Sequence, residues 1–157
     1  MLAGAGALVA AAAGMPVLTL PGLVTPLAVA GLLVAAAGLA LAWVAQSLMG
    51  SSWRIGVDPG ETTALVTTGV FARARNPIFT AMILAQAGTV LMAPSCLSLA
   101  ALAALVAAIE LQVRRVEEPY LRAAHGPGYL DYAAQVRRFV PLLGRYRITA
   151  AAAVTRA

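Results

Sequence analysis

Two separate polar segments hold the residues that could do chemistry in an otherwise apolar chain. The first reads "ARNPIF" at residues 74–79. Asn76 is a good helix N-cap and Pro77 suits the first helical position, so this pair alone predicts only a helix start. Arg73 and Arg75 flank the positive end of that helix, where cations are disfavoured. They indicate either an anchor on the cytoplasmic side of a membrane or an anion site, in which guanidinium and backbone N–H groups bind one ligand.

The second polar segment covers residues 109–141 and reads "IELQVRRVEEPYLRAAHGPGYLDYAAQVRRFVP". Charges of alternating sign recur there at i,i+4 steps, which by itself predicts a salt-bridged helix. These charges belong to Glu110, Arg114, Glu118 and Arg122. Glu117 lies off this ladder and close to a long apolar run, where ionisable groups are costly and indicate function. Pro119 predicts a break or kink directly after the Glu pair.

Within this segment, "HGPGYLDY" at residues 125–132 predicts a change of helix. One helix is expected to end at Gly126 and another to start near Asp131. His125 is the only histidine; it is typical of a cap at a helix C-terminus, and catalysis is the alternative. One histidine and one cysteine do not favour a metal site with the usual nitrogen and sulfur ligands.

The composition predicts that membrane helices position these segments. Apolar residues make up 61% of the 157 residues and charged residues only 11%, whereas a soluble domain carries about 25% charged residues. The apolar runs approach the roughly 20 residues that a membrane-spanning helix needs. The length fits one membrane domain over residues 1–157.

Four membrane-spanning helices are predicted, at residues 2–20, 25–49, 77–93 and 97–113. No positive residue precedes the first, as one would in a signal peptide, so we expect it to be retained. The second contains Gly31, Ala35 and Gly38, which favour close helix packing in lipid, although GC-rich codons would also supply such residues.

The arginines predict which segments face the cytoplasm. All eleven basic residues are Arg, and they lie in segments 50–76 and 114–157. The positive-inside rule makes both segments cytoplasmic, and four spans then place the N-terminus there too. The expected fold is all-α, with about four transmembrane helices and interfacial C-terminal helices. The net charge of +5 fits this topology and requires no nucleic acid. The lack of Lys, beside abundant Ala, Gly and Arg, indicates a GC-rich bacterial genome and hence a bacterial inner membrane.

Together the two segments resemble the membrane methyltransferases of the isoprenylcysteine carboxyl methyltransferase and phospholipid methyltransferase superfamily. The first family motif, R-H-P-x-Y-x-G, corresponds to residues 75–81, where Asn76, Phe79 and Ala81 replace His, Tyr and Gly. The second, E-E-x-x-L-x-x-x-F-G-x-x-Y-x-x-Y followed by V-x-R-F-x-P, is matched at Glu117, Glu118, Leu121, Gly126, Tyr129, Tyr132, Val136, Arg138, Phe139 and Pro141. The resemblance covers about residues 50–141.

This resemblance implies methyl transfer from S-adenosyl-L-methionine, with S-adenosyl-L-homocysteine as product, to a lipophilic acceptor that enters from the bilayer. The cofactor-binding positions it implies are Arg75, Asn76, Pro77, Glu117, Glu118, Leu121, His125, Gly126, Tyr129 and Tyr132. Arg75 would hold the carboxylate of the cofactor, and either glutamate would bind its ammonium group or its ribose. Tyr129, Tyr132 and His125 would line the adenine or methyl-donor region.

The catalytic candidates are Glu117, Arg138 and Arg114, with either arginine able to hold an anionic acceptor. Because Asn76 replaces the family's His, an inactive member with a structural role is an alternative. A four-span glutathione-type membrane transferase is a second, but it would carry its polar residues inside the spans. A small multidrug exporter would need a carboxylate in the first span, and residues 1–53 contain no charged side chain.

Overall fold

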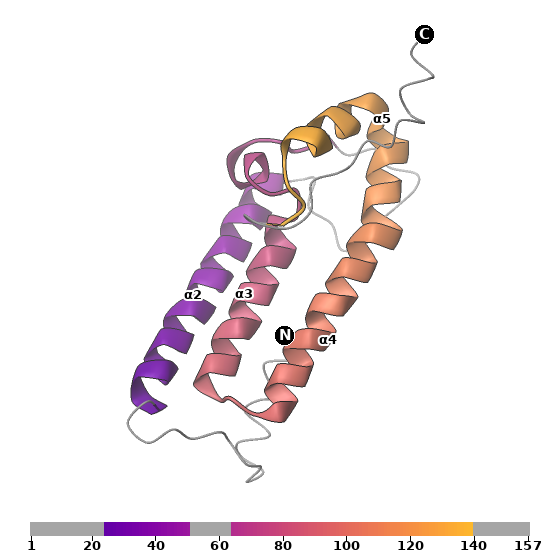
Figure 1. Cartoon of the computed structure of the whole chain (residues 1–157). Helices are drawn as coiled ribbons and strands as arrows, with labels where there is room; N and C mark the ends of the chain where they lie inside the picture. The colour runs from indigo at the N-terminus through magenta and orange to yellow at the C-terminus, as the bar shows by residue number, and fades with distance from the viewer. Residues whose placement is uncertain (1–23, 51–63, 140–157) are drawn as a thin grey trace. The chain divides into compact units, whose positions relative to one another are not determined.

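The computed structural model describes residues 24–50 and 64–139 (Figure 1). The first predicted span, the start of the first cytoplasmic segment and the C-terminal tail lie outside these residues. The described part is all-α, as predicted. Its elements are α2 (Val24–Met49), the 3-10 turn η2 (Gly69–Ala72), α3 (Pro77–Met92), α4 (Cys96–Gln112), the π-turn η3 (Val113–Glu117) and α5 (Glu118–Gln135).

Helices α2, α3 and α4 confirm the second, third and fourth predicted apolar helices to within a residue or so at each end. Among the described residues, two helices are long and apolar enough to cross a membrane, Thr25–Met49 and Cys96–Gln135. The apolar part of the second is α4, since four charged residues follow within residues 114–118. The number of four spans stays a prediction because the first lies outside the described residues.

The chain divides into two compact units. The bundle unit consists of Met1–Trp43 and Ile78–Gln112, and its described part contains most of α2 with α3 and α4. The polar unit consists of Val44–Pro77 and Val113–Ala157, and its described part contains η2, η3 and α5. The two arginine-rich segments therefore belong to the same unit.

Small residues hold α2 against α3 in the bundle unit, where the two helices run side by side (Figure 1). A Cβ added to Gly31 would lie 2.6 Å from the carbonyl oxygen of Gly88. A Cβ added to Gly38 would lie 2.5 Å from the backbone nitrogen of Ala85, and one added to Gly88 would collide with the backbone of Ala35. The predicted close packing at Gly31, Ala35 and Gly38 is confirmed, because no larger side chain fits between these backbones.

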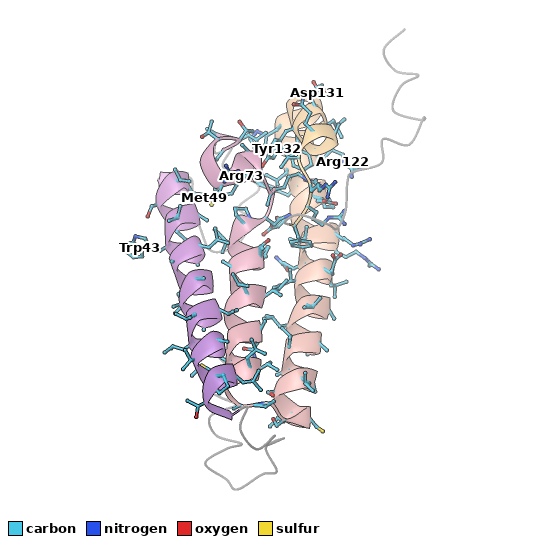
Figure 2. The ribbon with its side chains drawn as sticks, turned by 60° about the vertical axis from the view of Figure 1, so that its left-hand side comes forward. Trp43, Met49, Arg73, Arg122, Asp131 and Tyr132 are labelled. Atoms are coloured by element: carbon cyan, nitrogen blue, oxygen red, sulfur yellow. The ribbon has the colours of Figure 1, made fainter. Side chains whose placement is uncertain are left out.

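The outward faces of the bundle unit carry apolar side chains. Leu33 on α2 is 66% exposed and Trp43 is 73% exposed, and Figure 2 shows Trp43 pointing away from the ribbon of its helix. Leu99 on α4 is exposed as well. Such surfaces suit lipid, which solvates them without the cost that water imposes.

A three-residue turn joins α3 to α4. Ser95 is the N-cap of α4: its hydroxyl accepts a hydrogen bond from the Ser98 N–H at 3.1 Å. In return, the Ser95 N–H donates to the Ser98 hydroxyl at 2.9 Å. This is the reciprocal pattern of a capping box, with Ser in place of the usual Glu or Gln at the third helical position. Both serines are buried, so the turn satisfies these polar groups itself.

The helix that leaves α4 differs from the prediction in two places. The break expected after the Glu pair occurs as the π-turn η3, before Pro119. Pro119 lacks an N–H and its ring clashes with the carbonyl four residues back, so a regular α-helical ladder cannot pass this point undisturbed. The break at Gly126 is confirmed, with φ 53° and ψ −129°. The helix resumes at once at Pro127 rather than near Asp131, because the fixed φ of proline suits a first helical turn.

Candidate functional site

A short backbone pairing joins the two polar segments within the polar unit. Ala74 and Arg137 form a parallel β-bridge. The Arg75 N–H donates to the Arg137 carbonyl at 2.9 Å, and the Asn76 N–H donates to the Arg138 carbonyl at 3.1 Å. The side-chain amide of Asn76 donates to the same Arg138 carbonyl at 3.2 Å, across 62 positions of sequence. Residues that are distant in the chain are thus held side by side at the start of α3.

Glu118 lies at the centre of a buried ion-pair cluster formed by Arg75, Glu118 and Arg138, which we call the arginine–glutamate cluster. Arg138 holds Glu118 with two parallel bonds, Nε to Oε1 at 2.8 Å and Nη2 to Oε2 at 2.9 Å. Arg75 Nη1 lies 3.0 Å from the same Oε1. All three residues are at most 9% exposed. Bidentate guanidinium–carboxylate pairs are among the strongest and most directional polar contacts in proteins.

Two tyrosines of α5 complete the network. Arg75 Nη1 also donates to the Tyr129 hydroxyl at 2.9 Å, and its guanidinium carbon lies 5.9 Å from the Tyr129 ring centre. The Tyr132 hydroxyl donates to the Phe71 carbonyl at 2.6 Å and ties α5 to η2. Burial raises the pKa of Tyr129, against the lowering effect of Arg75, and raises the pKa of Tyr132 to about 12. Both hydroxyls therefore stay protonated at neutral pH and act as hydrogen-bonding groups.

Glu117 differs sharply from its neighbour Glu118. It is half-buried, and within the described residues it makes no ion pair or hydrogen bond. Burial, followed by the repulsion of Glu118, raises the pKa of Glu117 from 4.5 to about 7. Glu117 can therefore take up or release a proton near neutral pH, as a general acid or base must.

The cluster places two guanidinium groups around the single carboxylate of Glu118. Both arginines are buried, and Glu117 ends the π-turn beside Glu118 without an ion pair to either arginine among the described residues. Positive and negative groups are therefore concentrated in one part of the polar unit, which suits a ligand that carries both kinds of charge.

All of the candidate site residues belong to the polar unit. Six of them form the network described above: Arg75, Asn76, Glu118, Tyr129, Tyr132 and Arg138. Pro77 is fully buried at the first position of α3. Leu121 and His125 are half-buried on α5, and Gly126 forms its kink. Arg114 lies on the π-turn with its side chain exposed, outside the arginine–glutamate cluster. Figure 2 shows the polar side chains of α5, among them Arg122, Asp131 and Tyr132.

Sequence reasoning missed two buried residues of the polar unit. Phe71 is 6% exposed and its carbonyl receives Tyr132, but a backbone acceptor leaves no mark in a sequence. Val113 is fully buried at the first position of the π-turn. Its only signal was its apolar character at the border of a charged segment.

The comparison with protein families agrees with this geometry. The family model described as phospholipid methyltransferase matches residues 26–127, well over half of the chain. No curated protein matches the chain. The family match includes α2, α3, α4, the π-turn and the glutamate pair, and the apolar helices fit a membrane location. The chain therefore belongs to the phospholipid methyltransferase family and is a membrane methyltransferase.

Proposed function

We propose that the polar unit binds S-adenosyl-L-methionine and that the protein transfers the cofactor's methyl group to a lipophilic acceptor at the cytoplasmic face of a bacterial inner membrane. The observation that carries this proposal is the arginine–glutamate cluster, with Glu117 beside it. Residues from both family motifs meet there, Arg75 from the first and Glu118 and Arg138 from the second. Family membership supports methyl transfer, and the cluster supplies charges of the kinds that the cofactor requires.

The chemistry of these side chains fits the cofactor. S-adenosyl-L-methionine carries a carboxylate, an ammonium, a ribose diol and a sulfonium. The guanidinium groups of Arg75 and Arg138 are of the kind that binds a carboxylate. Glu117 has no protein counter-ion among the described residues and suits the ammonium or the ribose hydroxyls. Tyr129 and Tyr132 offer aromatic surface beside these charges.

The cofactor, when bound, supplies a methyl group already activated on a sulfonium. The protein then has to hold donor and acceptor in line, and such positioning yields effective molarities of about 10⁵–10⁸ M. Glu118 and Arg138 are buried and are joined by two hydrogen bonds, so they give the site a rigid frame for this task. Glu117 accepts the proton that an amine or acid acceptor loses, because its pKa of about 7 lets it do so near neutral pH.

Arg138 already uses two of its nitrogens to hold Glu118. Arg114, the other arginine predicted to hold an anionic acceptor, is exposed on the π-turn and stays a candidate for that role. Asn76 keeps a defined role despite replacing the family's His, since its amide donates to the Arg138 carbonyl.

Isothermal titration calorimetry in detergent tests the proposal with S-adenosyl-L-methionine and its demethylated product. The wild type should bind both. Glu117→Gln should bind about tenfold more weakly or worse, since a hydrogen bond to a charged group contributes roughly 1.5–3 kcal/mol. Arg75→Ala should weaken binding of the cofactor by a similar factor. Arg73→Ala is the matched control, because Arg73 is exposed in the same segment and should leave binding unchanged. Absence of binding by the folded wild type would overturn the proposal.

A further inference from the structure

The buried side chains along the helix from α4 into α5 change their spacing at the glutamate pair. Ile109 is 4% exposed and Val113 is 0% exposed, four residues apart. The next buried side chain is Glu118 at 4%, five residues further on. In a regular α-helix each residue turns by about 100°, so residues four apart share a face. An uninterrupted helix would therefore continue the face of Val113 with Glu117, not with Glu118.

The π-turn accounts for the change. A π-turn closes i→i+5 instead of i→i+4 and acts as one extra residue in an α-helix. It covers Val113–Glu117, the interval between the two buried positions. Pro119 follows directly and removes one N–H that a regular ladder would use, which favours an irregular turn here. The extra residue rotates the chain so that Glu118 takes the direction that Glu117 would otherwise have.

We infer that the π-turn Val113–Glu117 is a one-residue register spacer that assigns separate roles to two adjacent glutamates. It directs Glu118 to Arg75 and Arg138, and it keeps Glu117 outside these ion pairs. Without the spacer, Glu117 would face the arginines and form the ion pairs that Glu118 now makes. Its carboxylate would then no longer be available as a base or a ligand. The register itself is independent of the proposed function; only the use of Glu117 as a base or cofactor ligand rests on it.

Deletion of a single residue tests the spacer. Removing Val116, which is 40% exposed, makes Glu118 the fourth residue after Val113. The shortened segment would then bring Glu118 to the arginines without the extra residue of the π-turn, with Pro119 still in the first turn of α5. We expect the midpoint of thermal unfolding in detergent to fall by less than about 4 °C. The matched control removes Ala123, an exposed residue in the regular part of α5. That deletion rotates Tyr129 away from Glu118 and should lower the midpoint by more than about 10 °C.

The titration of Glu117 gives a second readout that needs no cofactor. Infrared spectra of the carboxyl C=O stretch should show a group that titrates near pH 7 in the wild type and, at nearly the same pH, in the Val116 deletion. Glu117→Gln should abolish this signal. The inference is overturned if the Val116 deletion is as damaging as the Ala123 deletion, or if it folds but loses the titrating group. Failure to bind S-adenosyl-L-methionine would contradict the proposed function and leave both of these results unaffected.

Discussion

The bundle unit and the polar unit achieve specificity in opposite ways. In the bundle unit, α2 and α3 fit together because glycines have no side chain. At Gly31, Gly38 and Gly88 the two backbones approach so closely that an added Cβ would collide. In the polar unit, the two polar segments are joined by the long side chains of Arg75 and Arg138, which both bind the carboxylate of Glu118. Lipid supplies little hydrophobic force between helices, so the first unit depends on packing. The second unit is rich in charge, so it depends on directional polar bonds. The units should therefore fail under different substitutions and different conditions.

The largest effect is expected at Glu118. Glu118→Ala leaves two buried guanidinium groups without their shared counter-ion, and breaking a buried pair costs about 3–5 kcal/mol. Equilibrium unfolding in mixed detergent micelles would measure this loss. The matched control is Glu117→Ala, which removes the same chemical group one residue away and should cost less than about 1 kcal/mol. Equal losses for the two variants would contradict the central place of Glu118.

A smaller effect is expected in the bundle unit. Gly88→Val places a branched side chain against the backbones of Gly31 and Ala35, and overpacking of this kind costs about 1–3 kcal/mol. The same unfolding measurement applies, and the loss should be independent of pH and salt. Gly128→Ala is the control, because a Cβ there meets nothing within 4 Å. Its stability should equal or exceed that of the wild type. A pH-dependent loss at Gly88 would show that the two units are not energetically distinct.

The smallest effect is the pH dependence that Glu117 adds to the polar unit. The pKa of Glu117 is about 7 in the folded protein, against an ordinary value of 4.5 that applies to the unfolded chain. Between pH 4.5 and 7 the folded state therefore binds more protons than the unfolded state. The unfolding free energy should therefore fall as the pH rises from about 4.5 to 7 and level off above. We expect about 1–2 kcal/mol after allowance for solvent screening of a half-buried group. Glu117→Gln should remove this slope; a Gln variant with the wild-type slope would assign it to another residue.

The helices were predictable because lipid imposes a simple rule on apolar runs. The start of α3 at Pro77 followed from a short, specific signal, the Asn76-Pro77 pair, and is confirmed. The joining of Arg75 to the glutamate pair followed from two family motifs that are far apart in sequence. This too is confirmed in part, by the contact between Arg75 and Glu118.

The roles of the two glutamates were not predictable from the same patterns. The i,i+4 ladder placed Glu118 beside Arg114 and Arg122 on a solvated face, but the π-turn moves Glu118 inward to Arg138. A one-residue change of helical register has no signature except Pro119, which indicates a disturbance without its form. The bridge between Ala74 and Arg137 was invisible for a related reason: backbone pairing does not depend on side-chain identity.

The turn between α3 and α4 has a consequence for the depth at which this end of the bundle unit lies in a bilayer. The 16 residues of α3 rise about 24 Å, which is short of the roughly 30 Å thickness of a bilayer's hydrocarbon region. A hairpin tip that had to reach water would need a longer helix. Ser95 and Ser98 remove this need by bonding to each other and to the Ala93 carbonyl. We therefore expect the tip to end among the acyl chains, where a water-soluble thiol reagent added from that side should not label Cys96.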